Sequence, residues 1–183
     1  MKLLLVRHAR TSAAVGLCYG RTDVAVPAEA TLALAERIAA ELPADIALVS
    51  SPLQRCAALV HAIAVLRPDL SLHIDPRLAE MDFGAWEERS WTAIDRAEFD
   101  RWMADFADAR AGGTGESTRQ FMLRVGSAFY GWRGGGRDAL WVTHAGVIRA
   151  VWLMQQGVRC AERADQWPTR SIAFGECVSV ELP

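Results

Sequence analysis

The sequence lacks the features that mark several protein classes. No apolar run approaches the roughly 18 residues that a membrane span needs. The N-terminus has no long apolar segment followed by a small-residue cleavage site, so we expect no secretory leader. Lysine is nearly absent: Lys2 stands alone beside 19 arginines, and with 22 acidic residues the net charge is −2. The arginines are spread along the whole chain, so we expect neither a nucleic-acid partner nor a membrane partner.

The four cysteines form no recognisable metal-binding pattern. Cys18, Cys56, Cys160 and Cys177 have no C-x-x-C spacing and do not cluster with histidines, which argues against a zinc site. We expect no metal and no cofactor. Disulfides are uncommon in the cytoplasm, and we expect a cytoplasmic protein with free thiols.

Apolar segments of strand length alternate with segments of helical period. The chain has 183 residues, of which 51% are hydrophobic, and this is enough for a sizeable core. Strands are predicted at 2–6, 46–49, 70–74, 139–143 and 177–182, and helices at 28–42, 52–67 and 117–133, with a further helix that opens at His144. Such alternation is typical of an α/β fold. We predict a three-layer α/β/α sandwich with a mostly parallel central sheet, as a single domain over residues 1–183.

Residues 78–113 are less regular, and we interpret them as an excursion over the active site. Phe99, Trp102, Met103 and Phe106 fit one helical face, which we assign to packing rather than to substrate contact.

At the start of the helix predicted at 52–67, Ser51 is predicted as the N-cap and Pro52 as the first helical residue.

Polar residues follow the predicted strands at the end where ligands bind in such sheets. Arg7 and His8 follow the first strand; Ser50, Ser51 and Arg55 follow the second; Arg77 and Glu80 follow the third; Thr143 and His144 follow the fourth. Cations, imidazoles and a carboxylate therefore converge from four places. This set suits phosphoryl transfer, because arginine donors match phosphate oxygens in pairs.

Each of these side chains has a predicted role. Arg7 and Arg55 would clamp the phosphate, and His144 opens a helix whose first backbone N–H groups, at Ala145, would also bind it. His8 would attack phosphorus as a neutral imidazole. Glu80 would protonate the leaving oxygen and then deprotonate water. No metal is required where cationic side chains neutralise the developing charge.

Four segments resemble one known family. Residues 5–11, L-V-R-H-A-R-T, resemble the R-H-G-x-T signature of the histidine phosphatase (phosphoglycerate mutase-like) superfamily, and residues 50–55 match its S-S-P-L-x-R motif. Residues 78–87 are similar to its acid loop, and residues 143–149 to its second-histidine motif. The resemblance implies a phosphohistidine on His8, a phosphate pocket of Arg7, Arg55 and His144, and Glu80 as proton donor. Arg149, inside the last motif, is expected to face away from the phosphate.

The same resemblance suggests a substrate. Residues 18–23, C-Y-G-R-T-D, and 82–86, D-F-G-A-W, look most like the α-ribazole phosphatases, which remove phosphate from α-ribazole 5′-phosphate during cobalamin biosynthesis. Aromatic residues within 83–106 would stack on the flat base. Tyr19 and Arg21 are further candidates for substrate contact.

The chain also departs from the family pattern. Ala9 replaces the usual Gly after the histidine, and Ala14 stands where an Asn often holds phosphate. Thr11, Ser12 or backbone groups would have to supply the missing contact. Arg10 replaces a frequent Glu and makes the mouth more cationic.

Three other functions remain open at this point. A phosphoglycerate mutase would use the same pocket but would need more cationic groups and a lid, and a broad-specificity phosphatase would accept many small phosphate esters. A non-catalytic phospholigand-binding module would not need His8 and Glu80. A small-molecule phosphate ester is the expected partner in each case, and a homodimer is neither required nor excluded.

Overall fold

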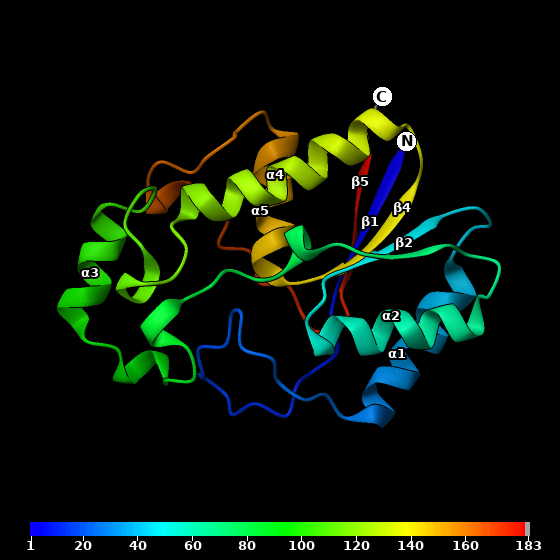
Figure 1. Ribbon diagram of the computed structural model, residues 1–183, viewed down its shortest axis with the longest axis horizontal. Helices are drawn as coiled ribbons and strands as arrows, with labels where there is room; N and C mark the ends of the chain where they lie inside the picture. The colour runs from blue at the N-terminus through cyan, green and yellow to red at the C-terminus, as the bar shows by residue number, and fades with distance from the viewer. Residues whose placement is uncertain (182–183) are drawn as a thin grey trace.

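A five-stranded sheet forms the centre of the structure, which is a computed structural model that describes residues 1–181 (Figure 1). The strands are β1 (Lys2–Arg7), β2 (Ala47–Ser50), β3 (Leu72–Ile74), β4 (Ala139–Thr143) and β5 (Cys177–Glu181). Their order is β3-β2-β4-β1-β5. Only β5 runs antiparallel to its neighbour, which confirms the mostly parallel sheet. Leu182, the predicted end of the last strand, lies outside the described residues.

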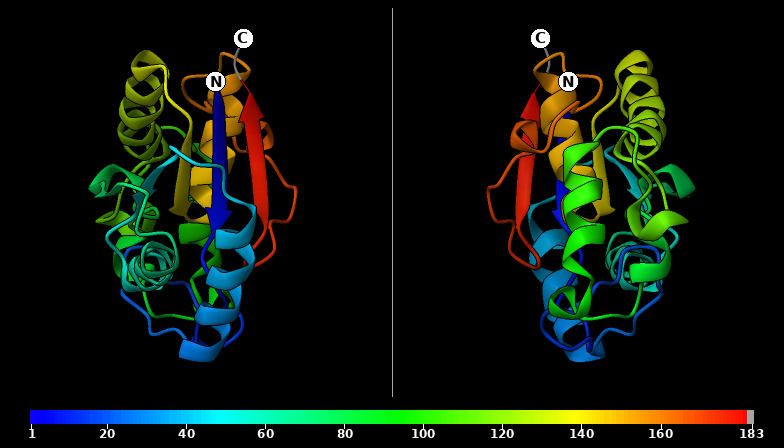
Figure 2. Two further views of the ribbon diagram at one scale, coloured as in Figure 1. Left: turned by 90° about the vertical axis from the view of Figure 1, so that its right-hand side faces the viewer. Right: turned by 90° about the vertical axis from the view of Figure 1, so that its left-hand side faces the viewer.

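Helices cover both faces of this sheet. The helices α1 (Ala28–Glu41) and α2 (Gln54–Leu66) share one face, and α4 (Thr118–Gly135) and α5 (Ala145–Gln155) share the other (Figure 2). Side chains of a strand alternate between the two faces. Leu3 and Leu5 of β1 accordingly join the core beneath α4 and α5, whereas Val6 joins the core beneath α1 and α2. The predicted three-layer α/β/α sandwich is confirmed.

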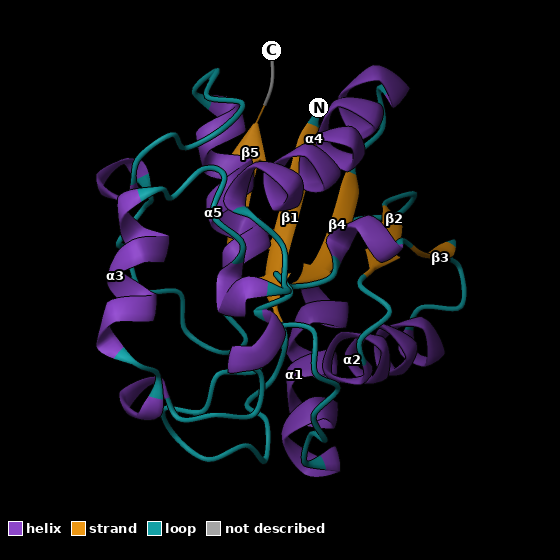
Figure 3. Cartoon of the chain, turned by 60° about the vertical axis from the view of Figure 1, so that its left-hand side comes forward, coloured by secondary structure: helices purple, strands orange, loops and turns teal. Residues whose placement is uncertain are grey.

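The excursion carries its own small helix, α3 (Arg96–Ala104), which stands away from the sheet beyond α5 (Figure 3). Trp86, in a 3-10 turn, is 2% exposed and contacts the rings of Trp91, Phe99 and Trp102. The prediction that Phe99, Trp102, Met103 and Phe106 share one helical face is wrong for Phe106. Phe106 lies beyond the last residue of α3, and it is buried there rather than on the helix.

The start of α2 also differs from the prediction. This helix begins at Gln54, and Leu53 occupies the N-cap position without a side-chain bond. The Ser51 hydroxyl accepts from the backbone N–H of Leu53 at 3.3 Å, as an N-cap does, and it is also bonded to Nε2 of His144 at 2.8 Å. The predicted cap interaction is therefore present, although the α-helix itself begins two residues later than predicted. The predicted capping box of α4 is also present, between Ser117 and Gln120.

No helix in the described part of the chain combines the length and the apolar character that crossing a membrane requires.

Candidate active site

Three neighbouring strands end side by side and present the sequence-predicted side chains together. In the sheet Arg7 is paired with Thr143, and Ser50 with Val142. The next residues continue this register, since the N–H of His8 donates to the carbonyl of Thr143 at 3.0 Å. The parallel sheet therefore places β1, β4 and β2 at one edge, where each can contribute to a single site.

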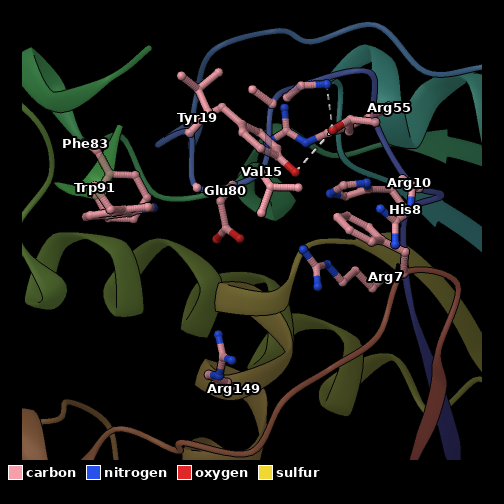
Figure 4. Close-up of a pocket in the computed structure, with 16 residues that line it drawn as sticks. Arg7, His8, Arg10, Val15, Tyr19, Arg55, Glu80, Phe83, Trp91 and Arg149 are labelled. Atoms are coloured by element: carbon pink, nitrogen blue, oxygen red, sulfur yellow. Dashed lines mark hydrogen bonds between the residues drawn. The ribbon is translucent and has the colours of Figure 1, made fainter. Parts of the chain in front are cut away.

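A cavity of about 550 Å³ opens at this edge, and we call it the first cavity (Figure 4). Four arginines line it: Arg7, Arg10, Arg55 and Arg149. Glu80 is the only carboxylate among the described residues that line it, and Figure 4 shows this group pointing into the open space. The lining is strongly cationic, as a phosphate site requires.

The ring of His8 is held in one tautomer. Its Nδ1 lies 2.7 Å from the carbonyl oxygen of Ala9. A carbonyl only accepts hydrogen bonds, so Nδ1 must carry the proton in this contact. In the neutral ring the lone pair then belongs to Nε2, which is the nitrogen available to attack a substrate.

The environment also keeps His8 neutral. Burial lowers the pKa of this imidazole to about 3, and the positive charge of Arg55 adds to the effect, as does that of Arg7. The hydrogen bond to Ala9 raises the pKa; its effect is smaller than that of burial or of Arg55 but larger than that of Arg7. An unprotonated imidazole is the nucleophilic form, so the two arginines that would attract a phosphate also preserve the reactivity of His8.

His144 is completely buried, and both of its ring nitrogens are occupied. Its Nδ1 accepts from Nε of Arg55 at 3.2 Å, so the proton of the neutral ring is on Nε2 and is donated to Ser51. Burial, followed by the charge of Arg55, lowers the pKa of His144 well below its ordinary value. Its ring centroid lies 5.3 Å from that of His8.

Arg55 is anchored by the loop that follows β1. Its side chain is 1% exposed, and its two terminal nitrogens donate to the carbonyls of Gly20 and Thr22 at 2.6 and 2.8 Å. The guanidinium is therefore oriented before any ligand arrives. Arginine has five donor N–H groups, so the remaining ones can still face the first cavity.

The carboxylate of Glu87 holds the same loop from its other side. It accepts from the backbone N–H groups of Gly20, Arg21 and Thr22 and from the Thr22 hydroxyl, at 2.6–3.1 Å. It also accepts from the N–H of Phe83. The carbonyls of this loop thus bind Arg55 while its N–H groups bind Glu87. This role of Glu87 was not predicted from the sequence, where its place within residues 78–87 was the only signal.

Glu80 sits at the N-terminus of α5. Its carboxylate accepts from the N–H of Gly146 at 3.0 Å and from its neighbour Met81 at 3.1 Å. A Cβ at position 146 would lie 2.2 Å from Oε1 of Glu80, so only glycine allows this close approach. The carboxylate is fixed where the first cavity opens.

Arg7 is the second arginine at the end of β1. Its guanidinium carbon lies 3.8 Å from the ring centroid of Phe174, and one terminal nitrogen donates to the carbonyl of Ile172. Within residues 1–181 its buried Nε has no hydrogen-bond partner. Phe174, whose ring is also 5.5 Å from that of His8, was not predicted. It follows an irregular segment that carries no periodic signal.

The predicted substrate-binding residues differ in whether they line the first cavity. Thr11 and Tyr19 line the first cavity, with the Thr11 hydroxyl 3.2 Å from that of Tyr19. Arg21 is exposed and pairs with Asp82, so it does not line this cavity. Ala145 is half-buried beside Gly146, whose N–H is already taken by Glu80.

Two arginines differ from their expected placement. Arg77, predicted to follow the third strand toward the site, is bound by Asp75 and Ser127 instead. The expectation that Arg149 faces away is wrong, since Arg149 lines the first cavity. It lies one helical turn after Ala145, and residues four apart share a helix face, which is the signal that could have found it.

Comparison with known proteins identifies one family. The model of the histidine phosphatase superfamily (branch 1) matches residues 3–170. No curated protein matches the chain.

Several solved structures are similar along the whole chain. The protein TTHB049 from Thermus thermophilus is 30% identical with a TM-score of 0.72, and the match covers 100% of this chain and 95% of that one. The α-ribazole phosphatase from Shigella flexneri is 25% identical with a TM-score of 0.80, and the match covers 100% and 91%. Mycobacterial hydrolase 2, at 21% identity and a TM-score of 0.78 over 97% and 80% of the two chains, shares the fold.

The charge state of His8 can be measured directly. Because its pKa is lowered to about 3, His8 should remain neutral as the pH falls from about 8 to about 5, where an ordinary histidine gains its proton. Nitrogen-15 NMR of the imidazoles should show an Nδ1-protonated neutral ring throughout this range. Protonation of His8 near pH 6 would contradict the described environment.

The role of Glu87 is also testable. In Glu87→Gln an amide NH₂ replaces one acceptor oxygen and faces backbone N–H groups. We expect the free energy of unfolding to fall by about 1.5–3 kcal/mol, the value of hydrogen bonds to a charged group. The KM for a phosphate ester should rise as Arg55 loses its orientation. The control is Glu88→Gln, because Glu88 is exposed; equal effects in both variants would refute the role.

Proposed function

The chain belongs to the histidine phosphatase superfamily, branch 1, and on this basis we propose that it hydrolyses phosphate monoesters through a phosphohistidine on His8. One observation carries the proposal. The hydrogen bond from Nδ1 of His8 to Ala9 leaves a neutral Nε2, in a cavity that also holds Glu80 and four arginines. A nucleophile, a proton donor and the charges that bind phosphate are thus in one place.

In the first step Nε2 of His8 attacks phosphorus, and the bond from phosphorus to the ester oxygen breaks. Glu80 gives its proton to the departing oxygen, so the product leaves as a neutral alcohol. Arg7 and Arg55 neutralise the charge that develops on the phosphoryl oxygens. The carbonyl of Ala9 stabilises the ring as it becomes positively charged, because it accepts from Nδ1–H throughout.

In the second step water attacks the phosphorus of the phosphohistidine. Glu80, now a carboxylate, takes one proton from the water, and the bond from Nε2 to phosphorus breaks. Inorganic phosphate leaves, and both His8 and Glu80 return to their starting states. The placement of Glu80 at the mouth suits both steps, since the alcohol must leave and the water must enter by the same side.

The substrate that we propose is α-ribazole 5′-phosphate, which would place the protein in cobalamin biosynthesis, in the cytoplasm. The likeness to the Shigella flexneri α-ribazole phosphatase supports this, since it extends over the whole chain. Residues 18–23 and 82–86, which look most like these enzymes, come together in the structure. Glu87 bonds the backbone of Gly20, and Arg21 pairs with Asp82.

The covalent intermediate gives the first test. A phosphoenzyme trapped with labelled substrate should be acid-labile and base-stable, as a phosphohistidine is. His8→Ala should lower kcat by roughly 10³-fold or more, because the nucleophile is lost. The exposed His61→Ala serves as the matched control. An acid-stable adduct, or retained turnover in His8→Ala, would place the nucleophile elsewhere.

A panel of esters gives the second test. We expect kcat/KM for α-ribazole 5′-phosphate to exceed the values for 3-phosphoglycerate, phosphoserine and a sugar bisphosphate by at least about 10-fold. Comparable rates on all four would leave a broad-specificity phosphatase. Isomerisation of 3-phosphoglycerate would identify a mutase.

A further inference from the structure

A second cavity, of about 490 Å³, adjoins the first. It lies between the excursion, the N-terminal ends of α4 and α5, and the segment 164–169. Glu80, Phe83 and Arg149 line both cavities. Glu80, the proton donor of the proposed reaction, therefore lines both the cationic first cavity and the second cavity.

The second cavity has a predominantly aromatic wall. Four of its lining rings form a continuous series, in which Trp102 contacts Phe106, Phe106 contacts Trp167, and Trp167 contacts Phe121. The centroids of successive rings are 5.2, 6.0 and 6.4 Å apart, with interplanar angles near 60°. Its size is that of a small-molecule site, and such sites are mostly apolar with a few polar groups.

We propose that the second cavity binds the ring of the leaving alcohol, and that this ring is a flat, largely apolar aromatic group. The inference rests on the proposed function, because it takes the phosphate to lie in the first cavity. Glu80, which lines both cavities, would then stand beside the ester oxygen that joins the two parts of the substrate. Trp102, Met103 and Phe106, assigned to packing from the sequence, become substrate contacts.

The first cavity offers a weaker site for such a ring. Four arginines line it, whereas Arg149 is the one arginine among the described residues that line the second cavity. Binding of the ring against Trp91, which lines the first cavity but not the second, is the outcome that opposes the proposal.

Filling the second cavity is the main test. Ala164 is a half-buried lining residue, and Ala164→Phe would place a ring in the space. We expect the ratio of kcat/KM for α-ribazole 5′-phosphate to kcat/KM for glycerol 3-phosphate, which has no ring, to fall at least about 10-fold. Ala97→Phe, on the exposed side of α3, is the matched control and should leave the ratio unchanged. An unchanged ratio in Ala164→Phe overturns the proposal.

Binding of free benzimidazole separates this inference from the proposed function. The probe should quench tryptophan fluorescence in the native chain and in His8→Ala, but not in Ala164→Phe. Hydrolysis of both esters together with benzimidazole binding that Ala164→Phe does not affect overturns the second-cavity proposal alone. If no ester is hydrolysed, the proposed function fails, and the leaving-group assignment fails with it even if benzimidazole binds.

Discussion

The hydrogen bond between Nδ1–H of His8 and the carbonyl of Ala9 determines which atom of the site can react. It fixes the tautomer, and burial beside Arg55 and Arg7 keeps the ring unprotonated. A strand end is well suited to this task, because the backbone that carries the carbonyl is held by β4 through the N–H of His8. The tautomer of the imidazole is therefore set by main-chain geometry, whereas its neutral state depends on burial and on the charges of Arg55 and Arg7.

Backbone groups also hold Arg55 in place. A buried guanidinium needs acceptors, and carbonyls of the loop at residues 20–22 supply two of them. The N–H groups of that loop are satisfied in turn by Glu87. The positive Arg55 and the negative Glu87 are thus linked through the peptide groups of this loop, and the salt bridges of the described residues include no direct pair between them. The charge of Arg55 still helps to lower the pKa of His8.

The sequence was sufficient where placement follows from strand ends, and insufficient where it depends on tertiary contacts. Arg7, His8 and His144 could be brought together from the sequence because the carboxyl ends of parallel strands share one edge. The second bond of the Ser51 hydroxyl, to His144, could not be predicted from the local sequence, because His144 is distant in the chain. Phe174 gave no signal in the sequence, since it lies in an irregular segment. The position of Arg149 depends on which face of α5 is turned toward the first cavity.

Two adjoining cavities of different character can bind the two parts of a substrate separately. A phosphate dianion is bound best by arginines, whereas a flat base is bound best by aromatic rings and a few donors. Keeping the two apart allows each part of a substrate to be desolvated in its own surroundings. Glu80 lies at the boundary of the two cavities, where the N–H of Gly146 in α5 holds its carboxylate and the absence of a Cβ at Gly146 leaves room for it. Under the proposed function, the alcohol would be bound on one side of Glu80 and the phosphoryl group on the other.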